Sequence, residues 1–325
     1  MDNKRCLVTG GAGFIGSHLA QRLQALGHEV TVLDNFYRGK SDYHEKLCKQ
    51  FRFIEGSVVD KELIEKVVPS HDIIFHMAAI LGVKTTMTRP VELIDTNIQG
   101  TRNILEAASR NGCKVIFAST SEVYGKGIPP FSEEGDRIYG SATKLRWSYA
   151  VGKALEETLC LGYGEKGLPV TILRYFNIYG PRAKEGPYAG VIPRFIRAAL
   201  QNQDITVYGD GTQTRCFTYV SDAVEATVRA MTPDANQEIL NVGSTNEMSI
   251  GELAAVIKRV TGTSSPIVHV PFEQVYPRGF EEIPNRVPDM AKSERILGFQ
   301  AQVTLENGLR DTVDWYREES GGAGR

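Results

Sequence analysis

The stretch Val8-Thr9-Gly10-Gly11-Ala12-Gly13-Phe14-Ile15-Gly16-Ser17 decides the fold of this chain. The apolar run 5–8 before it is typical of a short buried strand, and residues 17–26 after it carry apolar side chains at helical spacing. A strand, a glycine-rich turn and a helix in this order form a phosphate-binding unit. The glycines let the backbone approach a pyrophosphate closely, and the helix N-terminus offers it free N–H groups.

The next apolar run supplies a second part of the same pattern. Residues 29–33 end in Asp34, which follows Gly16 by 18 positions. An acidic side chain at the end of the second strand accepts hydrogen bonds from a ribose 2′-hydroxyl and repels a 2′-phosphate. The spacing therefore favours NAD over NADP, although Arg38, four residues later, could meet a 2′-phosphate.

Strand-like and helix-like segments then alternate as far as residue 177. The expected strands are 51–54, 71–76, 114–118 and 170–175, the expected helices are 61–68, 90–111 and 149–166, and 35–50 reads as a polar connection. Such alternation is typical of α/β proteins and predicts a Rossmann-type, doubly wound parallel sheet.

Beyond residue 177 the elements become shorter and glycine–proline pairs interrupt them, which predicts a smaller, interleaved C-terminal α/β region. We expect residues 1–177 and about 213–236 to form the dinucleotide-binding domain. Residues from about 178 to 212 and 237–320 should form the substrate-binding domain, and the glycine-rich tail 321–325 should be disordered.

The composition argues against several classes of function. The net charge of −2 gives no electrostatic basis for binding nucleic acid or an anionic membrane. The five cysteines are scattered without a CxxC pair, so we expect neither a disulfide framework nor a metal site. No apolar run reaches the roughly 18 residues of a membrane span, and strand-like sequence begins by residue 5. A cytoplasmic protein without a signal peptide is expected.

Candidate catalytic groups follow the expected strand 114–118. Residues 119–125, Ser-Thr-Ser-Glu-Val-Tyr-Gly, place hydroxyls and a carboxylate at the edge of the sheet where parallel strands end. Tyr149 and Lys153 are four residues apart and share one helix face. A neighbouring ammonium and a positively charged nicotinamide would lower the pKa of the phenol, making it a usable base for a sugar hydroxyl.

In aggregate the motifs resemble the extended short-chain dehydrogenase/reductase family, in the branch that modifies nucleotide sugars. The motifs that carry the resemblance are TGGAGFIG, Asp34, His76-Met77-Ala78-Ala79, STSEVYG, Tyr149 with Lys153, Arg174-Tyr175-Phe176-Asn177, Gly180-Pro181-Arg182, Tyr208-Gly209-Asp210-Gly211 and Arg286-Val287-Pro288-Asp289. They fall in family order over residues 4–316. The resemblance implies tightly held NAD, a 4-keto sugar intermediate and return of the hydride within one catalytic cycle.

The resemblance also implies roles for individual residues. Tyr149 removes the proton of the sugar 4-hydroxyl, Thr120 hydrogen-bonds that oxygen, and Lys153 holds the nicotinamide ribose. Other cofactor contacts are expected from Gly10, Gly13, Phe14, Ile15, Gly16, Asp34, Asn35, Ser57, Val58 and Ala78, with Ser57 standing where relatives carry Asp. Substrate contacts are expected from Asn177, Val191, Arg194, Tyr208, Arg215 and Arg286.

The fate of the keto intermediate separates three reactions. Ser121 and Glu122 resemble the order found in UDP-glucuronate decarboxylases and 4,6-dehydratases, whereas 4-epimerases usually carry small or neutral residues there. The segments 144–149 and 214–218 resemble the decarboxylase domain of the bacterial aminoarabinose pathway, which gives Arg215 a place at the reacting sugar. UDP-glucuronate decarboxylation is therefore the leading hypothesis, followed by 4-epimerisation and 4,6-dehydration.

Two further expectations concern the class of protein and its partners. A non-catalytic dinucleotide-binding regulator is a remote alternative, because it would have no reason to keep Thr120, Tyr149 and Lys153 together. The resemblance implies a UDP-sugar ligand and a homodimer formed by the helices at 96–111 and 149–166.

Overall fold

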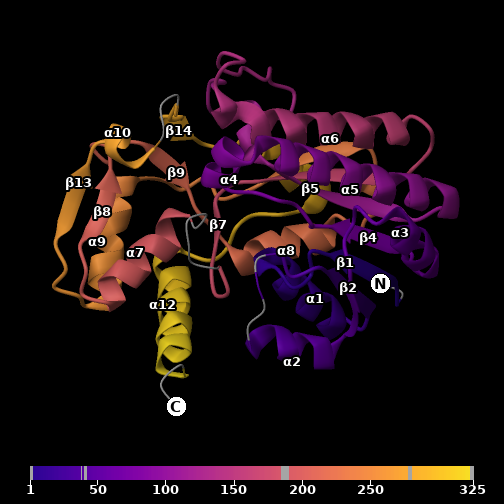
Figure 1. Ribbon diagram of the computed structural model, residues 1–325, viewed down its shortest axis with the longest axis horizontal. Helices are drawn as coiled ribbons and strands as arrows, with labels where there is room; N and C mark the ends of the chain where they lie inside the picture. The colour runs from indigo at the N-terminus through magenta and orange to yellow at the C-terminus, as the bar shows by residue number, and fades with distance from the viewer. Residues whose placement is uncertain (1–2, 38, 40–41, 184–189, 277–279, 323–325) are drawn as a thin grey trace.

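The computed structural model describes residues 3–37, 39, 42–183, 190–276 and 280–322, and a seven-stranded parallel sheet lies at its centre (Figure 1). The strand order is β11-β6-β5-β4-β1-β2-β3. The bounds are β1 Arg5–Thr9, β2 Glu29–Asp34, β3 Arg52–Glu55, β4 Ile73–His76, β5 Lys114–Thr120, β6 Val170–Tyr175 and β11 Glu238–Val242. The order reverses between β1 and β4, which creates a crevice at the carboxyl ends of these strands. The predicted fold class is confirmed.

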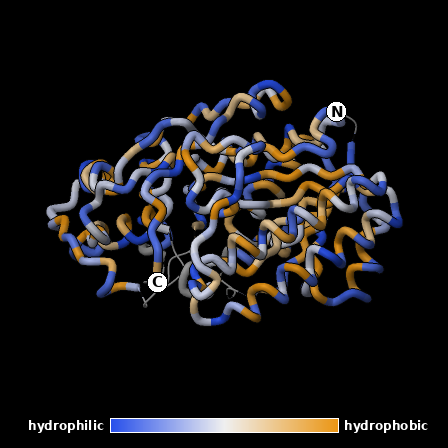
Figure 2. The backbone as a smooth tube through the Cα atoms, turned by 90° about the horizontal axis from the view of Figure 1, so that it is seen from above, coloured by the Kyte–Doolittle hydropathy of each residue, from blue (hydrophilic) through white to orange (hydrophobic). Residues whose placement is uncertain are grey.

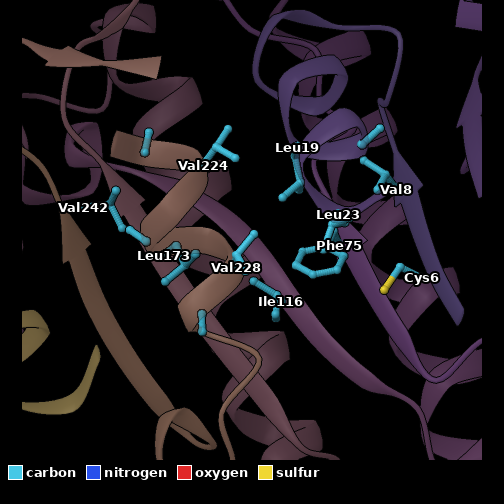
Figure 3. Packing of buried hydrophobic residues seen from close by; sticks show 14 of the residues in the cluster. Cys6, Val8, Leu19, Leu23, Phe75, Ile116, Leu173, Val224, Val228 and Val242 are labelled. Atoms are coloured by element: carbon cyan, nitrogen blue, oxygen red, sulfur yellow. The ribbon is translucent and has the colours of Figure 1, made fainter. Parts of the chain in front are cut away.

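Helices cover both faces of this sheet because side chains of each strand alternate between two apolar cores. Cys6 and Val8 of β1 belong to one core, and Leu7 between them belongs to the other. The first core contains residues of α1 (Phe14–Ala25), α2 (Asp42–Gln50), α8 (Val220–Arg229) and α11 (Ala291–Leu297), and the second contains residues of α3 (Lys61–Val67), α5 (Pro90–Asn111) and α6 (Ser148–Gly164). Figure 3 shows Leu19 of α1 and Val224 of α8 in the first core.

The hydropathy of the residues along the chain follows the same layering. Orange, hydrophobic stretches concentrate along the central strands, while the surrounding helices alternate between orange and blue (Figure 2). In the part of the chain that the structure covers, no helix has both the length and the apolar composition needed to cross a bilayer.

A smaller region lies beside the carboxyl edge of the sheet and has an apolar core of its own, which includes Phe195 and Leu253 (Figure 1). Its strands are β7 (Ile178–Tyr179), β8 (Ile205–Tyr208), β9 (Thr214–Cys216), β10 (Thr218–Tyr219), β12 (Glu247–Ser249), β13 (Ile267–Val270) and β14 (Asn285–Arg286). Its helices are α7 (Val191–Leu200), α9 (Ile250–Thr261), α10 (Phe272–Val275) and α12 (Leu305–Gly322). In β9 and β14, Arg215 and Arg286 are paired neighbours.

The structure corrects four details of the sequence prediction. Residues 42–50, expected as polar connection, form α2, which is anchored to the core by the buried Leu47. Strand β11 belongs to the large sheet and not to the substrate region, because its apolar residues pair with β6. Strand β9 lies in the smaller region, paired with β12 and β14. Helix α12 continues through Gly322, so the predicted disordered tail does not include residues 321 and 322. Arg38 and residues 323–325 lie outside the described residues.

Candidate active site

A cavity of about 980 Å³ runs along the carboxyl ends of the central strands. Its lining includes the glycine turn after β1, Asp34 after β2, Thr120 at the end of β5 and Tyr149 of α6. The smaller region contributes Arg286 of β14 and part of α12. The cavity therefore lies at the crevice that the strand order predicts and is shared by both parts of the molecule.

The glycine turn is too tight for side chains at Gly10, Gly11 and Gly16. A Cβ on Gly10, whose φ is +65°, would lie 2.7 Å from the backbone nitrogen of Ala78. A Cβ on Gly16 would lie 2.3 Å from the carbonyl oxygen of Gly10. Gly13 precedes α1 without a side-chain cap, so the N-terminal N–H groups of α1 are not taken up by one. This cradle fits the pyrophosphate of a dinucleotide.

Asp34 supports the turn and faces the cavity as well. Its Oδ2 accepts a hydrogen bond from the backbone N–H of Ala12 at 3.0 Å, and its Oδ1 accepts one from that of Phe36 at 2.7 Å. A carboxylate oxygen can accept more than one hydrogen bond, so these contacts leave capacity for ribose hydroxyls. The geometry of the turn and of Asp34 fits NAD.

The remaining expected cofactor residues also border this cavity. The lining contains Gly10, Gly13, Phe14, Ile15, Gly16, Asp34, Asn35, Ser57, Val58 and Ala78. The hydroxyl oxygen of Ser57 accepts a hydrogen bond from the N–H of Val59 at 3.4 Å, and its own hydrogen is still available for donation.

The expected catalytic groups meet where β5 ends beside the start of α6. Thr120 Oγ1 accepts a hydrogen bond from the N–H of Glu122 at 3.2 Å, as the cap of the short 3₁₀ helix η2 (Ser121–Tyr124). Lys153 Nζ donates to the carbonyl oxygen of Ala118 at 3.2 Å and to Glu156 Oε2 at 3.1 Å. Thr120, Ser121, Glu122, Tyr149 and Lys153 all line the cavity.

The environment of Tyr149 differs from the expected one. Burial raises the pKa of its phenol, and the carboxylates of Glu156 and Glu122 raise it further. The expected lowering by Lys153 is not seen, and the ammonium of that side chain is paired with Glu156 at 3.1 Å. Burial and these two carboxylates therefore favour the protonated phenol of Tyr149 over the phenolate.

Glu122 lies between two buried arginines. Arg146 Nη1 is 2.8 Å from its Oε2, and Arg286 Nη1 is 2.5 Å from its Oε1. Burial by itself would raise the pKa of Glu122, but Arg286 and Arg146 together outweigh that effect and lower the pKa to about 2. Glu122 is therefore a carboxylate at neutral pH and does not serve there as a general acid.

Arg146 was not among the site residues expected from the sequence. It lies in the 3₁₀ helix η3 (Leu145–Trp147), immediately before α6, and its guanidinium stacks on the ring of Trp147 at 5.2 Å. The signal that could have revealed Arg146 is its place three residues before Tyr149, within the segment 144–149 that resembles a decarboxylase domain.

The expected substrate residues divide into two groups. Asn177 and Arg286 line the cavity, whereas Val191, Arg194, Tyr208 and Arg215 are not among its described lining. The guanidinium of Arg194 lies 3.6 Å above the ring centre of Tyr208 and donates to the carbonyl of Thr206 at 2.9 Å. Arg215 is paired with Glu282, and burial followed by the charge of Arg286 lowers its pKa to about 10.

Within the described ranges, no group of three or more His, Cys, Asp or Glu side chains is arranged to hold a metal ion.

Comparison with known proteins assigns the family. Residues 6–243 match the NAD dependent epimerase/dehydratase family. This matched range includes the glycine turn, β5 and the helix that carries Tyr149 and Lys153. The chain belongs to this family. As a member, it is an enzyme that depends on NAD, in agreement with the geometry of the turn and of Asp34.

Individual relatives of this family extend over nearly the whole chain. It is 65% identical to UDP-N-acetyl-alpha-D-glucosaminuronate decarboxylase from Bacillus cytotoxicus, over 97% of this chain and 98% of that protein. It is 36% identical to UDP-glucuronic acid decarboxylase 1 from Xenopus tropicalis, over 98% of this chain and 73% of that protein. UDP-glucuronic acid 4-epimerase from Bacillus cereus, solved with UDP-glucuronic acid and NAD, superimposes with a TM-score of 0.84 at 30% identity, over 97% and 99%.

Proposed function

We propose that this enzyme decarboxylates a UDP-linked hexuronic acid, with UDP-N-acetylglucosaminuronate as the preferred substrate. The observation that carries the proposal is the clamp of Glu122 between Arg146 and Arg286 in the wall that also holds Thr120 and Tyr149. The 65% identical relative, named for this activity, supports both the reaction and the 2-acetamido sugar.

The charges of the clamp suit an anionic sugar. Arg146, Arg215 and Arg286 face Glu122 and Glu282, so three guanidiniums stand against two carboxylates and one positive charge is in excess. The Nε–H groups of Arg146 and Arg286 are buried without a hydrogen-bond partner among the described residues. A buried, unpaired donor costs free energy, which a substrate carboxylate at this position would recover.

In the first step, oxidation at C4, Tyr149 takes the proton of the sugar 4-hydroxyl while Thr120 hydrogen-bonds the same oxygen. The nicotinamide of bound NAD would supply the acceptor and later the source of the C4 hydride, and its positive charge would favour the phenolate of Tyr149. The product of this half is a β-keto acid, because the carboxyl group is attached to C5 next to the C4 carbonyl.

Loss of carbon dioxide then breaks the C5–C6 bond and leaves its electron pair in an enolate between C5 and C4. The raised pKa of Tyr149 keeps the phenol protonated at this stage, so that it donates a hydrogen bond to the negative C4 oxygen. Thr120 supplies a second donor. Uptake of one proton from solvent at C5 and return of hydride and the phenolic proton at C4 complete the cycle.

A 4-epimerase is the second candidate. The solved UDP-glucuronic acid 4-epimerase shares 30% identity with this chain and shows that this fold accommodates a uronic acid without requiring decarboxylation. The arginine clamp on Glu122 favours decarboxylation over this alternative, because it keeps two buried guanidinium donors in the cavity wall that would hold a sugar carboxylate.

The test is an NMR time course of the NAD-loaded enzyme with UDP-N-acetylglucosaminuronate, and separately with UDP-glucuronate, together with measurement of released carbon dioxide. We expect a UDP-pentose product and one carbon dioxide per turnover, faster with the 2-acetamido sugar. A galacto-configured uronic acid with its carboxyl intact would establish the epimerase instead. Water loss from UDP-glucose would indicate a 4,6-dehydratase.

We also propose a homodimer built on α5 and α6, which pack against each other. Val151 and Leu155 lie four residues apart on α6 and are 48% and 47% exposed, which is unusual for adjacent aliphatic side chains. Light scattering should give twice the chain mass, and Leu155→Glu should reduce it to one chain. The cytoplasmic location expected from the sequence stays a prediction.

A further inference from the structure

A buried ion pair lies directly behind the catalytic lysine. Lys153 Nζ and Glu156 Oε2 are 3.1 Å apart, and these side chains are 2% and 0% exposed. The same oxygen accepts a hydrogen bond from Thr101 Oγ1 of α5 at 2.7 Å, whereas Glu156 Oε1 has no hydrogen-bond partner among the described residues. A carboxylate buried this deeply needs its cation, because desolvation of an unpaired charge costs several kcal/mol.

From Thr101 a chain of hydrogen bonds leads to Ala78, which lines the cavity and is one of the expected cofactor contacts. His76 Nε2 lies 3.1 Å from Thr101 Oγ1, His76 Nδ1 lies 2.8 Å from Thr9 Oγ1, and the backbone N–H of Ala78 donates to Thr9 Oγ1 at 3.3 Å. Burial, and then the charge of Lys153, lower the pKa of His76 to about 3, so its ring is neutral.

The carboxylate of Glu156 and the neutral ring of His76 determine the direction of this chain. Because a carboxylate can only accept, Thr101 donates its one hydrogen to Glu156 and accepts from Nε2–H of His76. The neutral ring then carries no hydrogen on Nδ1, so Thr9 donates to that nitrogen. Each group has one assigned role, so the carboxylate of Glu156 is held in place from both α5 and α6.

We propose that Glu156 is a positioning residue for the catalytic lysine and sets the pH range in which Tyr149 acts as a base. Lys153 has three N–H donors, of which Ala118 and Glu156 occupy two, and the third remains for a ligand in the cavity that Lys153 lines. Glu156 also offsets the ammonium charge, so the phenol next to it faces a nearly neutral pair and not a full positive charge.

The other charged groups nearby do not substitute for Glu156. Glu157, the next residue on α6, is equally buried but binds Ser119 at 2.5 Å and Arg174 at 2.8 Å. Glu122 on η2 is held by its arginines, and Cys160, one turn further along α6, has its pKa raised by burial and stays a thiol. On the β5 side the ammonium of Lys153 meets the ring of Phe117, 4.5 Å from its centre.

The test follows the ultraviolet absorbance of tyrosinate in NAD-loaded protein as pH rises, with Tyr149→Phe subtracted to isolate this residue. In Glu156→Gln the ammonium is no longer offset, so Tyr149 should ionise about 1–2 pH units below its wild-type value. Glu156→Asp keeps the charge and should stay close to wild type. Glu165→Gln, at the exposed end of the same helix, is the matched control and should cause no change.

A double-mutant cycle covers the case in which Glu156→Gln does not fold. Lys153→Met alone should move the ionisation of Tyr149 to higher pH, and Lys153→Met with Glu156→Gln should return it close to wild type, because both buried charges are then gone. The proposal would be overturned if Tyr149 ionised at the wild-type pH in Glu156→Gln. It would also be overturned if Tyr149 ionised at the same pH in the double variant as in Lys153→Met alone. Because the readout needs no sugar substrate, it stands apart from the test for decarboxylation.

Discussion

Arg286 Nη1 lies 2.5 Å from Glu122 Oε1, and this contact joins η2, which follows β5 of the large sheet, to β14 in the smaller region. The two side chains are 8% and 16% exposed, so the pair is largely shielded from water. Arg146 completes the arrangement from the start of α6. Closure of the cavity and the charge of its wall thus depend on the same three side chains.

Replacing Glu122 by Gln should lower kcat by about 100-fold, because the arginines lose their orientation, while KM for the uronic acid changes little. The reason is that Glu122 orients Arg146 and Arg286, while the positive charge that attracts the substrate is kept or increased. Steady-state kinetics with released carbon dioxide as the readout would decide this. An increase in KM with kcat preserved would show that Glu122 acts in binding alone.

The same carboxylate should make stability depend on pH. Its folded pKa of about 2 lies below the ordinary value, so the unfolded chain takes up the proton first as pH falls. The stabilisation is therefore complete above the ordinary pKa of about 4.3 and disappears as pH falls towards 2. Glu122→Gln should cost roughly 3 kcal/mol in urea unfolding at neutral pH, and the difference should shrink in acid. Glu65→Gln, which removes an exposed carboxylate paired with Arg110, is the control and should show almost no difference at either pH.

Arg146→Met should raise KM for the uronic acid by at least about tenfold, because it removes a charged, buried hydrogen-bond donor from the wall of the cavity. The matched control is Lys126→Met, which removes a cation that also lies over the ring of Trp147 but is 42% exposed and paired with Glu281. The control should keep its KM within about twofold. Equal effects in the two variants would argue against a specific role for Arg146.

Asp34→Ala should reduce NAD affinity by about tenfold and remove most of the discrimination against NADP, since both the ribose acceptor and the repelling charge are lost. Asp34→Asn, which keeps an acceptor without the charge, should lose discrimination but retain more affinity. Titration calorimetry with each dinucleotide gives both quantities. Unchanged preference for NAD in both variants would mean that another residue selects the cofactor.

Gly16→Ala should abolish NAD binding, because its Cβ would lie 2.3 Å from a backbone oxygen that cannot move without opening the turn. Gly162→Ala is the control within a helix. It meets nothing within 4 Å and should stabilise α6 by about 0.5–1 kcal/mol. Fluorescence of bound NADH and thermal unfolding would separate the two results.

Local patterns were sufficient for the sheet and for the cofactor end of the cavity. The helix predicted at 90–111 and the strand at 170–175 have the observed bounds, because uninterrupted periodicity and flanking turn residues mark both. Helix α2 was missed because few of its residues are apolar, and among its described side chains only Leu47 and His44 are buried. Strand β11 was assigned to the wrong region because pairing with β6 is a long-range contact.

The sequence by itself determined the Rossmann architecture, the preference for NAD and the residues at the carboxyl ends of the strands, since each depends on neighbours within one strand–turn–helix unit. Only the tertiary structure decided how the charges pair. In the structure Glu122 forms ion pairs with Arg146 and Arg286, Arg215 forms one with Glu282, and Lys153 forms one with Glu156. The raised pKa of Tyr149 follows from burial and then from the charges of Glu156 and Glu122. Electrostatic effects depend on distance and solvent exposure, and most of these partners are far apart in the chain.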